Sequence, residues 1–157
     1  MWMVRLSENF SLQEFTKSQT AERRGFDNTP VEGHLENAKA LFENVVQPVR
    51  DNFGVTVINS GYRSGDLNYA IGGSNTSQHC KGQAVDIEIP GVANYDVAVY
   101  IRDNLDFDQL ILEFYTPGIP NSGWVHVSYN NTGDQRKSTL TALKENGKTV
   151  YKPGFIA

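Results

Sequence analysis

The sequence predicts an α+β fold with a mostly antiparallel central sheet and helices packed on one face. Helical patterns dominate the first third of the chain, and strand-like patterns dominate the rest, with one clear helix among them. The 157 residues are 39% hydrophobic, which is enough for a core of ordinary size. No linker, repeat or low-complexity segment divides the chain, so we expect one domain over residues 1–157.

The first helix signal is a capping box at the N-terminal end of the chain. Ser11 is followed three residues later by Glu14, a spacing in which each side chain bonds the other residue's backbone N–H. We therefore expect a short helix to begin there. Residues 17–28 are polar, and we expect them to form a loop.

A stronger helix signal begins at Thr29, which is followed by Pro30 at the first helical position. Apolar residues at helical spacing then continue for about 20 residues, which predicts a long amphipathic helix. Asn52 lies near its expected end. Pro48 lacks the N–H that would bond four residues back, so we expect a kink or an early end there.

The second part of the chain predicts strands separated by short helices. A short helix is expected over 67–71, and a longer one over 95–104 with Asn94 as its cap. Asn146 and Gly147 form the strongest short hairpin signal in the chain. The expected strands share β-branched or alternating apolar residues and cover 55–58, 84–89, 109–115, 124–129, 140–143 and 149–151.

The expected strand 84–89 includes a carboxylate that requires a partner. Asp86 alternates with Val85 and Ile87, so it lies on the opposite face from these apolar residues. A carboxylate in a half-buried strand costs free energy unless something pairs with it. His79, across a loop that turns at Gly82, is one candidate partner. The alternative is a solvated loop followed by an edge strand with its acidic face in water.

The two later strands bring further polar groups into reach. His126 shares a strand face with Trp124, and Glu113 lies on one face of the preceding strand. If the two strands form a hairpin in which Tyr115 faces Trp124, Glu113 lies directly opposite His126, with Cβ atoms about 5 Å apart. This expectation depends on the register, because a shift of one residue would place the two side chains on opposite faces.

His79, Asp86 and His126 together are two imidazoles and one carboxylate. Three protein ligands with a position left for water are typical of a catalytic zinc site, so we expect Zn²⁺ as cofactor. Bound zinc lowers the pKa of its water to about 7, and a nearby carboxylate can accept the water proton. Glu113 is the candidate base, and its alternative role is a strand-edge or ion-paired glutamate. We expect Cys80 to be a small buried thiol.

Three further residues are candidates for contact with the substrate. Arg63 follows an expected strand, where a fixed guanidinium can bind a carboxylate or an oxyanion. The alternative is an ordinary surface arginine. Ser77 can bond either the substrate or the loop backbone. We also expect Trp124 to contact the substrate.

The segments SGYRS, SQHCKGQAVDIEI and GWVHVS resemble the zinc D-alanyl-D-alanine carboxypeptidase and endopeptidase family, which has the Hedgehog/DD-peptidase fold. The resemblance covers nearly all of the chain up to about residue 130. It implies hydrolysis of peptide bonds in peptidoglycan stem peptides, with His79, Asp86 and His126 as zinc ligands. It also implies that Arg63 stabilises the oxyanion.

One position departs from the pattern of this family. Several members place an acidic or histidine base three residues before the last ligand, and Gly123 occupies that position here. Either Glu113 acts as base from the neighbouring strand, or the chain is a non-catalytic, metal-binding wall-recognition or phage structural module. A metal-dependent hydrolase of another substrate, such as a lactone or amide, is a third possibility.

Charge and hydropathy exclude several other roles. The net charge is −4 and the longest basic cluster is Arg23–Arg24, which argues against a nucleic-acid partner. No apolar run approaches 18 residues, so we expect no membrane insertion. The N-terminus lacks the apolar core of a signal peptide. We therefore expect a monomer in the cytoplasm of the producing cell, or of the host if it is a phage protein, that acts at the cell wall after release, like a phage lysin.

Overall fold

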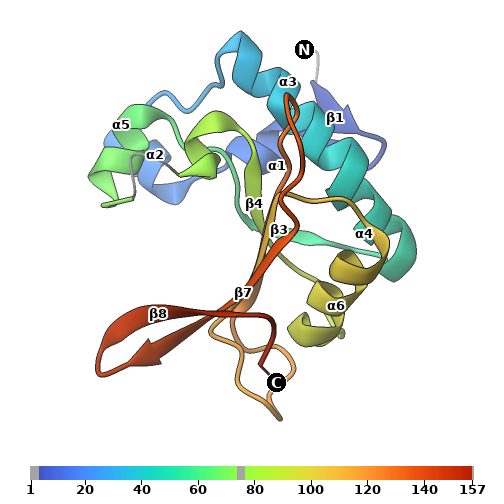
Figure 1. The fold of residues 1–157 in the computed structure, drawn as a ribbon. Helices are drawn as coiled ribbons and strands as arrows, with labels where there is room; N and C mark the ends of the chain where they lie inside the picture. Colours follow the sequence, from blue (N-terminus) through green and yellow to red (C-terminus); the bar gives the residue numbers. More distant parts are fainter. Residues whose placement is uncertain (1–3, 74–76, 157) are drawn as a thin grey trace.

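The computed structural model describes residues 4–73 and 77–156, which form a mixed α/β fold around a six-stranded sheet (Figure 1). All neighbouring strands are antiparallel except β5 and β7, so the predicted α+β class with a mostly antiparallel central sheet is confirmed. In spatial order the strands are β3 (Val57–Ser60), β4 (Ala84–Glu88), β6 (Trp124–Ser128), β5 (Gln109–Glu113), β7 (Ser138–Glu145) and β8 (Lys148–Pro153).

The N-terminal segment forms a small two-stranded sheet followed by two short helices. The capping box is confirmed, because Ser11 accepts the Glu14 N–H and the Glu14 carboxylate accepts the Ser11 N–H. The expected loop over 17–28 is wrong, since Ser18 caps a helix that ends at Gly25. These elements are β1 (Arg5–Ser7), β2 (Phe10–Ser11), α1 (Leu12–Thr16) and α2 (Gln19–Arg24).

The predicted long helix is continuous but is built from three parts, α3 (Glu32–Leu41), the π-helical η1 (Phe42–Val46) and α4 (Gln47–Phe53). In the π turn the Gln47 N–H bonds the Phe42 carbonyl, five residues back. This irregular turn lies directly before Pro48, which lacks an N–H, and the helix continues beyond the proline. The expected early end at Pro48 is therefore wrong, and the expected end near Asn52 is confirmed.

The expected start of this helix at Thr29 is two to three residues too early. The backbone N–H of Thr29 bonds the Asp27 carboxylate, and the Asn28 amide bonds the carbonyls of Thr16 and Tyr62. These side-chain bonds hold 27–29 in a non-helical conformation. The helix begins at Glu32 without a side-chain cap.

The remaining helices are α5 (Gly65–Ala70), the 3₁₀ turn η2 (Gln78–Lys81) and α6 (Asn94–Asn104). Asn94 begins α6 but is not its cap, because its side-chain amide instead donates to the carbonyls of Ser122 and Gly123. These bonds hold the β5–β6 connection beside α6. Within the described parts of the chain, no helix has the length and apolar character needed to cross a membrane.

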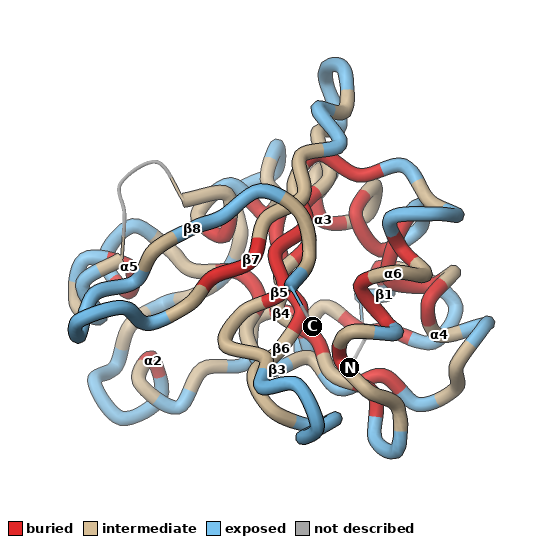
Figure 2. The backbone as a smooth tube through the Cα atoms, turned by 60° about the horizontal axis from the view of Figure 1, so that its bottom comes forward, coloured by how far each residue is buried: buried red, intermediate tan, exposed pale blue. Residues whose placement is uncertain are grey.

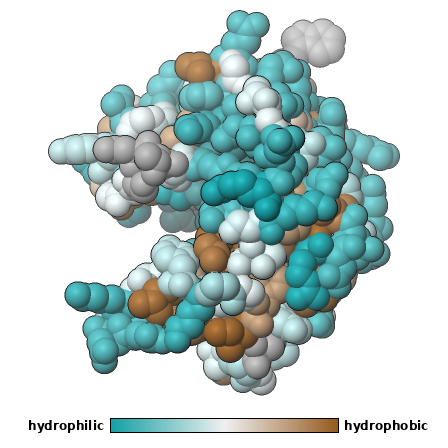
Figure 3. All heavy atoms as spheres, viewed as in Figure 1, coloured by the Kyte–Doolittle hydropathy of each residue, from teal (hydrophilic) through white to brown (hydrophobic). Residues whose placement is uncertain are grey.

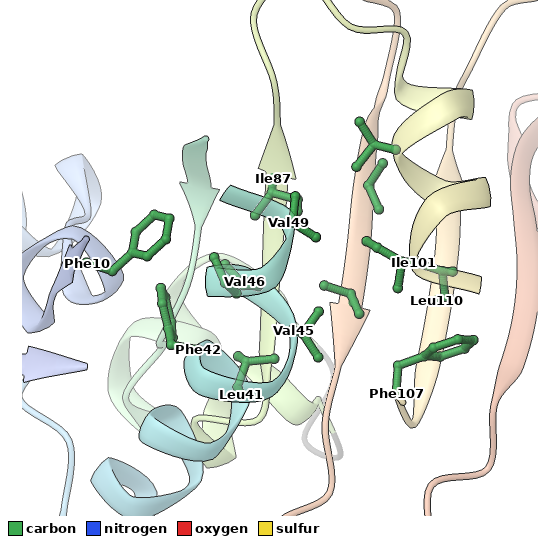
Figure 4. Close-up of a cluster of buried hydrophobic side chains, with 14 of the residues drawn as sticks. Phe10, Leu41, Phe42, Val45, Val46, Val49, Ile87, Ile101, Phe107 and Leu110 are labelled. Atoms are coloured by element: carbon green, nitrogen blue, oxygen red, sulfur yellow. The ribbon is translucent and has the colours of Figure 1, made fainter. Parts of the chain in front are cut away.

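One face of the central strands and the long helices form the hydrophobic core. Figure 1 shows α3, α4 and α6 on one side of the sheet, with α2 and α5 on the other. Buried residues are concentrated where the long helices meet the central strands (Figure 2). Figure 4 shows Val45 and Val49 of the long helix, Ile101 of α6, and Ile87 and Leu110 of the sheet in this cluster. The polar residues of the same strands therefore lie on the opposite face.

The register between β5 and β6 differs from the prediction by two residues. Glu113 pairs with Trp124, and Ile111 pairs with His126. The expected pairing of Tyr115 with Trp124 fails because the strand ends at Glu113, and Phe114 adopts a positive φ of 56°. A shift of two residues preserves the faces, since side chains alternate with period two. Glu113 and His126 therefore still share a face.

Candidate metal centre

The three predicted ligand residues come together from three elements on the polar side of the sheet. His79 Nε2 lies 3.4 Å from Asp86 Oδ1, and His126 Nδ1 lies 3.0 Å from the same oxygen. One ligand atom from each residue lies within 4.8 Å of the other two. Two imidazole nitrogens and one carboxylate oxygen thus converge on one point, although His126 lies 40 residues from Asp86 in the sequence.

Strand pairing and a tight turn produce this convergence. Asp86 on β4 pairs directly with His126 on β6, so the two side chains lie on the same face. His79 lies in η2, where its backbone N–H bonds the Ser77 hydroxyl. The turn ends at Gly82, which has φ 72° and lies so close to the His34 carbonyl that an added Cβ would collide with it. Glycine at this position lets the chain pass directly from His79 into β4.

The hydrogen bonds of His79 fix which ring nitrogen faces the site. His79 is 3% exposed, and its Nδ1 lies 2.8 Å from the carbonyl oxygen of Gly61. A carbonyl only accepts, so Nδ1 carries the proton and the Nε2 lone pair is directed at Asp86. A backbone carbonyl that orients an imidazole in this way is typical of histidine metal ligands. The residues present therefore fit a zinc ion, which prefers nitrogen and carboxylate ligands.

Asp86 is held in its charged form. Burial by itself would raise the pKa of this carboxyl, but the interactions with the His126 and His79 rings lower the pKa well below its ordinary value. The side chains of Asp86 and His126 are each 13% exposed. The Asp86 carboxylate is therefore a negatively charged oxygen ligand in a partly desolvated site, where it attracts a divalent cation strongly.

Glu113 lies on the same sheet face, on the strand next to His126. Its carboxylate accepts a hydrogen bond from the indole N–H of Trp124, the residue opposite it in the sheet. Burial, and then the negative charge of Asp86, raise the pKa of Glu113 above its ordinary value. Within the described residues it has no Lys or Arg at ion-pair distance, so the alternative of an ion-paired glutamate is not observed.

Gly123, the position at which the family resemblance led us to look for a base, has no room for a side chain. It has φ 64°, and an added Cβ would collide with the backbone of Glu113 and Phe114. The end of β5 therefore occupies the space that a side chain from position 123 would need. The atoms that fill this region are backbone atoms of Glu113 and Phe114.

Arg63 and Ser77 also lie beside the centre. Arg63 donates its backbone N–H to the His79 carbonyl at 3.2 Å and its Nη1 to Asn68 Oδ1 at 3.3 Å. Its Nε is buried and has no hydrogen-bond partner among the described residues. Ser77 lines the cleft, and its hydroxyl bonds the loop backbone, the second of its two expected roles. Cys80 is only half-buried and is absent from the cleft lining.

An open cleft of about 810 Å³ is lined by the three ligand residues together with Glu113, Arg63 and Ser77. Figure 3 shows it as a notch between the side of the molecule that bears α2 and α5 and the projecting β7–β8 hairpin. Sequence reasoning did not identify several of the residues that line it, namely Lys81, Gln83, Asn130, Thr132, Arg136 and Tyr151. Most of them come from the segment after β6, where no local pattern indicates proximity to the histidines.

A mixed α/β fold that gathers two histidines and an aspartate in an open cleft has the features of a metal-dependent hydrolase. The family model described as Peptidase M15 matches residues 8–128. The chain therefore belongs to the peptidase M15 family, a family of metallopeptidases, which confirms the predicted family. No curated protein matches the chain. The family match ends with β6, so β7 and β8 lie outside it.

Proposed function

We propose that the protein is a zinc peptidase that hydrolyses a peptide bond in peptidoglycan stem peptides. Membership of the peptidase M15 family supports a peptide substrate, and the convergence of His79, Asp86 and His126 is the observation on which the proposal rests. When bound, zinc supplies a Lewis acid and lowers the pKa of coordinated water to about 7. The bond cleaved is that of either a D,D-carboxypeptidase or an L-alanyl-D-glutamate-type endopeptidase.

Glu113 is the proposed general base. It shares a sheet face with His126, and the Trp124 indole holds its carboxylate in position. Burial, and then the charge of Asp86, raise the pKa of Glu113, which makes it a stronger proton acceptor than an exposed glutamate. In this proposal Glu113 accepts a proton from the attacking water and then delivers it to the leaving amine.

Arg63 is the proposed group that stabilises negative charge on the scissile carbonyl oxygen. Its backbone is joined to that of His79, so the guanidinium is held beside the metal ligands. The Arg63 side chain lines the cleft together with the three ligand residues, and a guanidinium is suited to pairing with an oxyanion. We propose that Trp124 and Ser77, which line the same cleft, contact the substrate.

Gly123 motivates a second candidate function, a non-catalytic wall-recognition or phage structural module that retains the metal site. The two functions differ in one measurable product. Purified protein is loaded with zinc, incubated with purified peptidoglycan, and assayed for new amino termini with and without a chelator. Zinc-dependent release supports the peptidase. Binding to peptidoglycan without release supports the module and refutes the peptidase.

A further inference from the structure

The cleft continues past the metal centre to an ion pair at the start of β5, between a buried aspartate and an exposed arginine. Asp108, which directly precedes this strand, is 4% exposed. Arg136 lies in the connection between β6 and β7, and its Nε and Nη2 bond the two oxygens of Asp108 at 3.0 and 2.8 Å. The Arg136 backbone N–H also bonds Asp108, at 3.1 Å. This two-point pairing fixes the plane of the guanidinium.

The same carboxylate connects this end of the cleft to the metal centre. Asp108 Oδ2 accepts a hydrogen bond of 3.0 Å from Gln78, the residue before His79. Asp108 therefore accepts hydrogen bonds from two separate segments, both of which line the cleft. The position of Arg136 is thus fixed relative to the turn that contains His79.

Outside the metal centre, the charged side chains that line the cleft are cationic. The Arg136 side chain is 59% exposed although it is paired, so its remaining N–H donors face the solvent of the cleft. Lys81 is exposed, lines the same cleft, and has no ion pair within the described parts of the chain. The acidic residues that line the cleft are Asp86 and Glu113, which lie at the metal centre. An anion that enters the cleft beside Arg136 would therefore meet no acidic side chain of the cleft lining outside the metal centre.

The separation from the metal centre matches the length of a short peptide segment. The Asp108 N–H bonds the Ser128 carbonyl, and Ser128 lies two residues beyond His126 on β6. Two strand residues span about 7 Å. A group about two residues from the scissile bond of an extended substrate would therefore reach the Arg136 side chain.

We propose that Arg136 and Lys81 form a subsite for a free carboxylate that lies about two residues from the scissile bond. The inference rests on the proposed function, because the substrate is taken to be a stem peptide, which carries free carboxylates. Arg136 lies outside the residues matched by the family model, so its contribution to the subsite lies beyond that match.

The test compares a synthetic stem pentapeptide with two versions in which either the internal or the terminal carboxylate is amidated. Arg136→Gln is expected to raise KM for the free-acid peptide about tenfold, with kcat nearly unchanged, as expected for a charge-assisted hydrogen bond. One of the two amidations should raise KM similarly in the parent protein and have little further effect in the variant. That amidation identifies the carboxylate bound.

Lys137→Gln is the matched control. Lys137 is adjacent, exposed and paired with Asp106, but it is absent from the cleft lining. It should leave KM within about twofold for all three peptides, since exposed ion pairs contribute little. Lys81→Gln, which leaves the Asp108 pair intact, should reproduce the direction of the Arg136→Gln effect. Equal losses on the free-acid and amidated peptides in Arg136→Gln would overturn the subsite.

Direct binding separates this proposal from the proposed activity. The zinc-loaded protein is titrated with the same three peptides by calorimetry. If no peptide is cleaved but binding is weakened by one amidation and by Arg136→Gln, the subsite stands and the peptidase proposal fails. If cleavage occurs and neither amidation nor Arg136→Gln changes binding, the peptidase stands and the subsite is refuted.

Discussion

Replacement of Glu113 by glutamine removes a proton acceptor while it preserves the shape of the side chain. The Trp124 indole can donate to the amide oxygen of glutamine as it does to the carboxylate. Glu113 is not one of the three converging ligand residues, so zinc content should stay at about one ion per chain. The substitution therefore tests the base separately from the metal.

The expected loss follows from the role of a positioned base. General base catalysis contributes about 10²–10⁴-fold, so kcat should fall by that factor while KM changes little. The pH profile supplies a second readout. Since burial, and then Asp86, raise the pKa of Glu113, the acidic limb of kcat/KM should lie above about pH 4.3, the ordinary value for glutamate. Activity falls as pH decreases through this limb, because the protonated carboxyl accepts no proton.

The assay is the rate of release of new amino termini from a synthetic stem peptide between pH 4 and pH 9. Glu88→Gln is the matched control, because Glu88 lies two residues from Asp86 on β4 but is absent from the cleft lining. It should retain the parent rate. A Glu113→Gln protein with the parent kcat and the same acidic limb would refute the assignment of the base.

Three further substitutions test the metal centre and its surroundings. Asp86→Asn should reduce the zinc content well below one ion per chain, because the anionic oxygen that faces both histidines is lost. Zinc content is measured by metal analysis after dialysis, and an unchanged content would contradict the ligand set. Gly123→Ala should destabilise the protein by about 3 kcal/mol in urea unfolding, because the alanine would need a positive φ and its Cβ would collide with backbone atoms. Gly91→Ala is the control, because Gly91 has a positive φ but open space around it, and it should cost about 1 kcal/mol. Equal losses of stability in the two variants would contradict the proposed crowding at Gly123. Asp108→Asn should cost about 1 kcal/mol at pH 7. Because Arg136 lowers the folded-state pKa of Asp108, this stabilisation is present above the unfolded pKa of about 3.9 and is lost as pH falls through the folded pKa. The difference in urea midpoint between Asp108→Asn and the parent should therefore shrink towards pH 2, and a constant difference would contradict the reasoning.

Strand periodicity was sufficient to group the strand residues of the metal centre, whereas His79 lies in a 3₁₀ turn. Alternation placed Asp86, His126 and Glu113 on polar strand faces, and the structure brings those faces together. The predicted register was wrong by two residues, but an even error leaves every side chain on its expected face. Face assignment is therefore more robust than pairing, because it depends only on the local alternation of each strand.

Elements without strong periodicity were harder to predict. Helix α2 has a serine cap and a glycine end, but Ala21 is its only buried residue, so no apolar stripe indicated it. Tyr151 reaches the cleft only because β5 pairs with β7 and β7 pairs with β8, which places it in one row with Glu113 and Ala142. Such long-range pairings leave no local signature. The position of Arg136 depends likewise on a distant carboxylate.

The parallel alignment of β7 with β5 also determines where the chain can be cut. A fragment that stopped at residue 128, the boundary of the family match, would lose both strands of the C-terminal hairpin. The backbone N–H and C=O groups of β5 that now bond β7 would become an exposed sheet edge beside Leu110 and Leu112. An open edge of this kind is a template for pairing with another chain. Such a shortened product should therefore self-associate, and recombinant versions should extend through Pro153.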